Sequence, residues 1–259
     1  GDPSSFQFSH ALVRDTLYDD LAPAQRAQLH QRIALALEAM HRDDLTPCLS
    51  ALAHHWHAAG KAGDVAKAVE YARRAARHAT ALLAHEEAAR HYRLAAAALG
   101  TAAPTLAQRC ELLLGQGDAE NNAGDSAGAL ATFAEAAACA RRVGGASLLS
   151  RAAIGFGTAQ WRQGVDGTQA ALLAREALAL SHAPAADARS GPADALSPAA
   201  EAPSNATDAS SDATDAPSAA ADAFSSAADT PTHAVDARER VRLHSALCRA
   251  LLFSNRPAE

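Results

Sequence analysis

Two Gly-Asp dipeptides, each followed by small residues at fixed offsets, constrain the fold of this chain more than any other feature. The dipeptides are Gly63-Asp64 and Gly124-Asp125, and the same positions matter five, nine and twelve residues after each glycine. These positions hold Ala68, Ala72 and Ala75 after the first dipeptide, and Ala129, Phe133 and Ala136 after the second. Glycine adopts the left-handed backbone that ends one helix, and aspartate caps the start of the next. The pattern therefore predicts tight helical hairpins whose helices approach through small side chains.

The composition favours the same class of fold. Alanine accounts for 72 of the 259 residues, whereas the aromatic residues are limited to six Phe, two Trp and three Tyr. Alanine has the highest helix propensity, and strands prefer β-branched and aromatic side chains. We therefore predict an all-α fold and exclude a β-sandwich or a β-barrel.

Apolar periodicity predicts a run of helices after Pro47, separated by short breaks. The expected ranges are 48–59, 64–82, 85–99, 104–122, 125–143, 147–163, 168–182 and 235–254. Within the range 85–99, Ala88, Tyr92 and Ala95 repeat the hairpin spacing without a Gly-Asp pair. Stacked hairpins of this kind form a solenoid with a concave surface, which is an architecture for binding.

Residues 1–46 do not follow this repeat. Phe6 and Phe8 flank Gln7, an alternation consistent with one strand. Apolar residues at helical spacing come next, namely Leu12, Val13, Leu17 and Leu21. A second helix is expected to begin at Pro23. Its predicted inward face consists of Leu29, Ile33, Leu37 and Met40.

The segment 183–234 differs from the rest in composition. Its 52 residues hold 20 Ala, eight acidic residues and six Pro, with only Leu196 and Phe224 as large apolar anchors. Such a stretch cannot bury enough surface to offset its ordering entropy. We predict a disordered insertion, with an acidic interaction tail as the alternative. Because the net charge of −6 is concentrated here, the helical part is nearly neutral.

The four cysteines lie far apart and form no CxxC pair, so we interpret them as reduced thiols in a cytosolic protein. No run of 18 apolar residues marks a membrane span. The chain begins without Met or a signal peptide, and we expect it to be part of a longer protein.

Four stretches carry a resemblance to a known family, and the two later ones, LLLGQGDAENNAGDSAGALATFAEAAACARRVG from Leu112 and RERVRLHSALCRALLFSNRP from Arg238, are similar to later repeats of one helical array. The stretch that begins at Phe8 reads FSHALVRDTLYDDLAPAQRAQLHQRIALALE, and it closely resembles the end of the winged-helix region in bacterial STAND-type signalling ATPases. The stretch from Leu52 reads LAHHWHAAGKAGDVAKAVEYARRAARHATALLAHEEAARHYRLAAAAL, and it is similar to the helical repeats that follow there. The hairpin offsets themselves resemble degenerate tetratricopeptide repeats. The resemblance implies a winged-helix remnant at 1–46, repeats at 47–182 and a further repeat helix at 235–259.

The resemblance also implies a function. In that family an ATPase domain that binds ATP and ADP precedes this region, and a DNA-binding or cyclase output domain often belongs to the same chain. No GxxxxGK[ST] run occurs here, so the nucleotide would bind to the upstream domain. We expect a sensor and coupling arm in a transcriptional regulator, with a protein or small-molecule inducer on its concave face. The alternative is a freestanding scaffold for protein partners.

His10 is the candidate site residue. In related STAND proteins a Met-His-Asp motif places its histidine against the β-phosphate of bound ADP. Here the tripeptide is Ser9-His10-Ala11, so the resemblance carries over through His10 alone. A histidine can donate a hydrogen bond to phosphate. The alternative is a packed or surface histidine at the start of a helix.

Other chemistry finds less support. His54 and His57 lie three residues apart and could share a metal, with Cys48 earlier in the chain. No second ligand pair has helical spacing nearby, so we interpret these residues as packing and expect no metal. The sequence contains no GxSxG elbow or paired catalytic carboxylates, and we predict no enzymatic activity for this chain. One short arginine stripe at 73–77 is too little for direct nucleic-acid binding.

Overall fold

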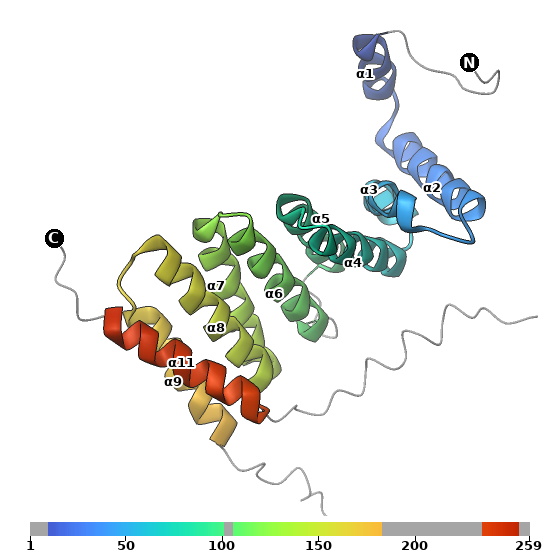
Figure 1. Cartoon of the computed structure of the whole chain (residues 1–259). Helices are drawn as coiled ribbons and strands as arrows, with labels where there is room; N and C mark the ends of the chain where they lie inside the picture. Colours follow the sequence, from blue (N-terminus) through green and yellow to red (C-terminus); the bar gives the residue numbers. More distant parts are fainter. Residues whose placement is uncertain (1–9, 101–105, 183–234, 254–259) are drawn as a thin grey trace, which may run out of the picture.

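The computed structural model describes residues 10–100, 106–182 and 235–253, and these ranges contain helices and turns but no strand (Figure 1). The predicted all-α class is confirmed, and the predicted helix ends after Pro47 agree with the structure to within two residues. The α-helices are α1 (Ala11–Asp19), α2 (Pro23–Met40), α3 (Leu49–Ala59), α4 (Val65–Ala81), α5 (His85–Leu99), α6 (Leu106–Asn122), α7 (Ser126–Val143), α8 (Ala146–Gln163), α9 (Thr168–His182) and α11 (Ala237–Phe253). Two short 3₁₀ helices, η1 (Thr46–Cys48) and η2 (Gly60–Ala62), flank α3.

From α2 to α9, consecutive helices pack against each other, so the fold is a helical repeat (Figure 1). The helix pair α6 and α7 shows how the predicted hairpin closes. Gly124 adopts a φ of +90°, a backbone conformation that would be strained in a residue with a side chain. The Asp125 carboxylate accepts a hydrogen bond from the Gly128 amide at 2.9 Å. Gly144 and Gly164 end α7 and α8 with the same left-handed backbone.

The first Gly-Asp pair works differently from our expectation. Asp64 caps α4 as predicted, since its Oδ1 accepts hydrogen bonds from the amides of Ala66 and Lys67. Gly63, however, has a φ of −95° and is not a left-handed cap. Because η2 precedes the turn, the residue with positive φ is Gly60. Glycine is needed at position 63 for a different reason, since a Cβ there would lie 2.8 Å from the Ala59 Cβ.

The small-residue positions form the core between helices. Ala129 and Ala136 are 0% exposed and Phe133 is 1% exposed. The equivalent residues of α4 are buried as well, namely Ala68, Ala72 and Ala75. The predicted hairpin register is therefore confirmed at both Gly-Asp pairs.

Enlarging a residue at this contact is expected to destabilise the array. Ala136→Leu should lower the free energy of unfolding by roughly 1–3 kcal/mol, because the added methyl groups overpack a closed interface. Ala138 lies on the exposed side of the same helix, and Ala138→Leu serves as the matched control. Urea unfolding followed by circular dichroism measures both variants. Equal stability of the two would contradict the observed register.

The inward face predicted for α2 is wrong at three of its four positions, because only Leu37 packs against the buried cluster between α2 and α3. Leu29, Ile33 and Met40 are 39%, 42% and 76% exposed, whereas His30 and Ala34 are buried. The helix is rotated because the small Ala34 permits close contact with α3, where Trp56 is buried in the same cluster. The predicted strand at 6–8 lies outside the described residues.

The last helix continues the array. α11 packs against α8 and α9, although 183–234 separates it from α9 in the sequence (Figure 1). The contact is close, because a Cβ at Gly167 would collide with the carbonyl group of Ala250. The predicted insertion at 183–234 lies outside the described residues. No helix in the described part of the chain is long and apolar enough to span a membrane.

Candidate functional site

A groove of about 600 Å³ lies between α6, α8 and α11. One face of α8 forms its floor, because the residues at 151, 155, 158 and 162 recur at helical spacing. α6 and α11 form its two walls. The polar and charged lining residues are Asp118, Asn121, Asn122, Arg151, Thr158, Arg162, Asp236, Arg238, Glu239 and Arg242.

The groove has an excess of positive charge. Four of its lining residues are arginines and three are carboxylic acids. Burial raises the pKa of the Asp118 carboxyl, although the neighbouring Arg151 opposes this effect. Burial also raises the pKa of Glu239. Both shifts have the same cause, which is that burial penalises the charged form of a carboxyl group.

Two of the arginines are fixed by contacts at the edge of the groove. Arg151 Nη1 lies 2.7 Å from both carboxylate oxygens of Glu111. The Arg162 guanidinium donates to the backbone carbonyl of Asn121, which ties α8 to the end of α6. Arg238 and Arg242 are exposed on α11. The arginines of the floor are thus held by contacts with α6, whereas the α11 wall presents exposed cationic side chains.

Asn121 contributes a buried side chain to the wall of the groove. Its residue is 6% exposed, and its side-chain oxygen Oδ1 has no hydrogen-bond partner among the described residues. Nearly all buried polar groups in folded proteins are hydrogen-bonded. The Oδ1 atom is itself shielded, so it is a polar group enclosed in the wall and does not offer a ligand contact.

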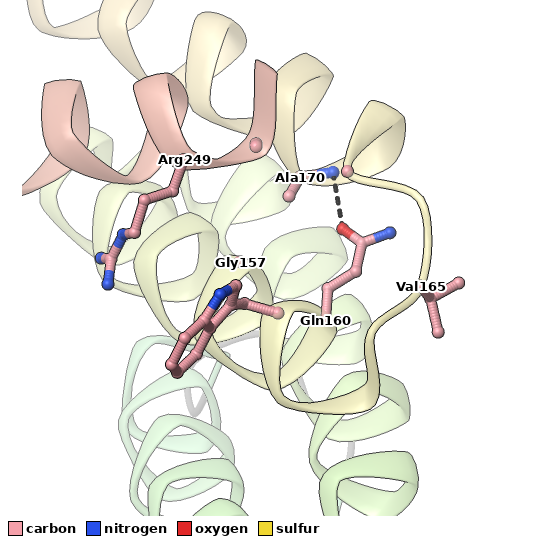
Figure 2. A pocket seen from close by; sticks show the side chains of 8 residues that line it. Gly157, Gln160, Val165, Ala170 and Arg249 are labelled. Carbon is pink, nitrogen blue, oxygen red and sulfur yellow. Dashed lines mark hydrogen bonds between the residues drawn. The ribbon is translucent and has the colours of Figure 1, made fainter. Parts of the chain in front are cut away.

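A second pocket lies where α8, α9 and α11 meet (Figure 2). Its volume is only about 10 Å³, which suffices for about one water molecule. The Gln160 Oε1 accepts a hydrogen bond from the Ala170 amide at 3.1 Å, and its Nε2 donates to the carbonyl of Asp166. These contacts close the turn between α8 and α9. We therefore assign this pocket a structural role.

His10 lies at the N-cap of α1 with an extended backbone. The residue is exposed, and its side chain makes no capping hydrogen bond to the helix. The imidazole is therefore accessible to a group that does not belong to the described residues. The nucleotide role of His10 stays a prediction, since the phosphate would belong to another domain.

His54 and His57 of α3 do not form the ligand pair that their spacing suggested. Cys48 is buried and donates to the Leu45 carbonyl at 3.3 Å. His54 lies beside His55 and His30 of α2, and one nitrogen from each of the three rings lies within 4.8 Å of the other two. His57 is outside this group. His30 was not predicted to join these histidines, because it lies 24 residues before His54 in the sequence. It also lies on α2, whose buried side the hydrophobic pattern did not identify correctly.

One further group resembles a catalytic arrangement. The Ser50 Oγ lies 3.0 Å from the His91 Nε2, and the Glu87 Oε1 lies 3.3 Å from the same nitrogen. A catalytic triad requires the carboxylate at the opposite ring nitrogen. His91 Nδ1 is buried without a partner among the described residues. The geometry does not make Ser50 a nucleophile.

Comparison with known proteins adds no assignment. The chain matches no protein-family model, no curated protein and no solved structure. The function of the chain is therefore inferred from the groove, the exposed surfaces and the side-chain clusters.

Proposed function

We propose that this chain is the sensor and coupling arm of a cytosolic signal-transduction ATPase, and that an inducer binds in the groove between α6, α8 and α11. The groove itself, which three helices enclose and four arginines line, is the observation that carries the proposal. The four arginines favour an inducer, either a small molecule or a protein segment, with acidic or phosphate groups. The nucleotide itself binds to the upstream domain.

An exposed apolar surface at the other end of the array supports the coupling role. Leu12 and Leu17 of α1 are 78% and 52% exposed, and Leu29, Ile33 and Met40 follow helical spacing along the exposed side of α2. Contiguous exposed apolar patches mark interaction surfaces. In the proposed protein the upstream ATPase domain covers this surface.

The two ends can be coupled through the packed helices. A ligand in the groove contacts α11 and α8 together, and it stabilises the arrangement in which these helices are closest. A ligand shifts an equilibrium only by its differential affinity for the two states. The inducer thus favours the arrangement of the array that releases ADP from the neighbouring domain, and the regulated output is transcription or cyclic nucleotide synthesis.

The test uses the full-length protein and a groove variant. The sequence encoded upstream is expected to contain a GxxxxGK[ST] run, and the full-length protein is expected to bind ADP. Thr158 lies in the groove floor, so the larger side chain of Thr158→Phe should block the groove. An extract of the source cells that contains the inducer should accelerate ADP release from the wild-type protein. The same extract should have no effect on Thr158→Phe. Ala138→Phe, on the exposed side of α7, should respond as wild type does.

The scaffold alternative predicts the opposite. A protein without an upstream ATPase domain, or one whose ADP release is identical in wild type and Thr158→Phe under all conditions, would contradict the coupling role. Circular dichroism of both variants separates loss of folding from loss of binding.

A further inference from the structure

Three histidines converge at the contact between α2 and α3. The Nδ1 atoms of His30 and His55 are 2.8 Å apart, and the ring centroids of His30 and His54 are 5.5 Å apart. The centroids of His54 and His55 are 5.2 Å apart. One potential ligand atom from each ring lies within 4.8 Å of the others. This concentration of imidazoles draws on two helices that are separated in sequence.

The surrounding packing holds the two helices in place. His30 is 7% exposed, and Ala34, one turn later on α2, is fully buried in the cluster that contains Trp56 of α3. The Trp56 Nε1 donates to the Glu38 Oε1 at 3.0 Å. The interface is therefore fixed by apolar packing and a hydrogen bond beyond the histidines, and it positions His30 opposite α3.

Tyr18 of α1 provides an outer contact. Its hydroxyl oxygen lies 2.9 Å from the His30 Nε2. If this nitrogen donates to Tyr18, the His30 Nδ1 presents its lone pair toward α3. Histidines that bind metals usually donate their second ring nitrogen to an oxygen atom in this way.

We propose that His30, His54 and His55 bind a divalent transition-metal ion, with Zn²⁺ as the best fit. Imidazole nitrogens suit Zn²⁺, Ni²⁺ and Cu²⁺, whereas Mg²⁺ and Ca²⁺ prefer oxygen ligands. Three side-chain ligands leave a tetrahedral ion one position for water.

The required movements are small. Tetrahedral ligands at about 2.0–2.1 Å from Zn²⁺ are separated from each other by about 3.3 Å. The Nδ1 atoms of His30 and His55 therefore move apart slightly, and the exposed His54 turns inward from at most 4.8 Å.

The ion would cross-link α3 to α2, and Tyr18 would extend this connection to α1. These helices join the exposed apolar surface to the repeat array. The site requires neither the groove nor an ATPase domain, so it is independent of the proposed function.

Isothermal titration of the metal-free chain with ZnCl₂ tests the site. One Zn²⁺ per chain is expected, together with a rise in the melting temperature. His30→Gln should weaken binding by more than about a hundredfold, because it removes a ligand, and Tyr18→Phe by about tenfold through the outer contact. Absence of stoichiometric binding would overturn the proposal.

His57→Gln is the matched control, since His57 lies on α3 but outside the group. Its affinity should equal that of wild type. If His57→Gln weakens binding while His30→Gln does not, the ion sits on a surface pair of His54 and His57 and the inference is wrong. His55→Gln provides the equivalent test should the buried His30 variant not fold. Co²⁺ substitution gives a second readout, an intense visible absorption from a tetrahedral ion that His30→Gln and His55→Gln abolish.

Discussion

The Phe133→Ala variant is expected to lose about 3–5 kcal/mol of unfolding free energy, the largest stability effect we predict for a single side chain. Phe133 is 1% exposed in the core that α6, α7, α8, α9 and α11 share. Removing its ring deletes buried apolar surface and leaves a cavity among helices that cannot fully collapse.

The neighbours of the ring explain the size of the effect. Phe133 of α7 packs against Gly117 of α6 and Gly155 of α8. A Cβ at Gly117 would lie 2.8 Å from the ring, and a Cβ at Gly155 would collide with it. Both glycines are therefore needed to make room for the aromatic side chain, which connects three consecutive helices.

Urea unfolding measures this loss, with Leu172→Ala as the control because Leu172 is 59% exposed. The control should change stability by less than about 0.5 kcal/mol. A double-mutant cycle sharpens the test. Gly155→Ala should destabilise the wild-type chain but be tolerated with Phe133→Ala, since the added methyl group enters the vacated space. Additive losses in the double variant would show that Phe133 and Gly155 are not in contact.

The helices and hairpins were predictable because their signals are local. Gly124 and Asp125 specify a turn through backbone freedom and capping, whichever helices lie nearby. The alanines and Phe133 then identify the buried side of the following helix. The Gly63 turn deviates because η2 changes the geometry that precedes it, which the dipeptide itself does not encode.

The rotation of α2 was not predictable from hydrophobicity. Leu29 and Ile33 are more apolar than His30 and Ala34, yet the latter pair faces α3. Close helix packing favours the small side chain, and hydrogen-bond contacts with Tyr18 and His55 satisfy the buried imidazole. The preference therefore depends on α1 and α3 together, and no periodicity within α2 reveals it.

The groove was not predicted, because the sequence indicated only that stacked hairpins form a concave binding surface. Its floor follows from α8, but its α11 wall comes from beyond the segment 183–234. Arg238 and Arg242 face Asp118 and Arg151 only once α11 has packed on α8 and α9. Such long-range placement leaves no spacing signal in the sequence.

His10→Ala in the full-length protein is expected to produce the largest functional effect. If His10 donates a hydrogen bond to the phosphate of bound ADP, its removal withdraws about 1.5–3 kcal/mol from the ADP-bound off state alone. ADP should then dissociate roughly tenfold to more than a hundredfold faster, and basal output should rise without inducer.

The position of His10 in the structure makes this experiment decisive. The exposed side chain makes no capping hydrogen bond to α1, so its removal costs the described fold little stability. His78→Ala, at an exposed position on α4, should leave ADP release unchanged. Stopped-flow release of a fluorescent ADP analogue and basal output are measured in the same preparation. Unchanged ADP release in His10→Ala would rule out the phosphate contact.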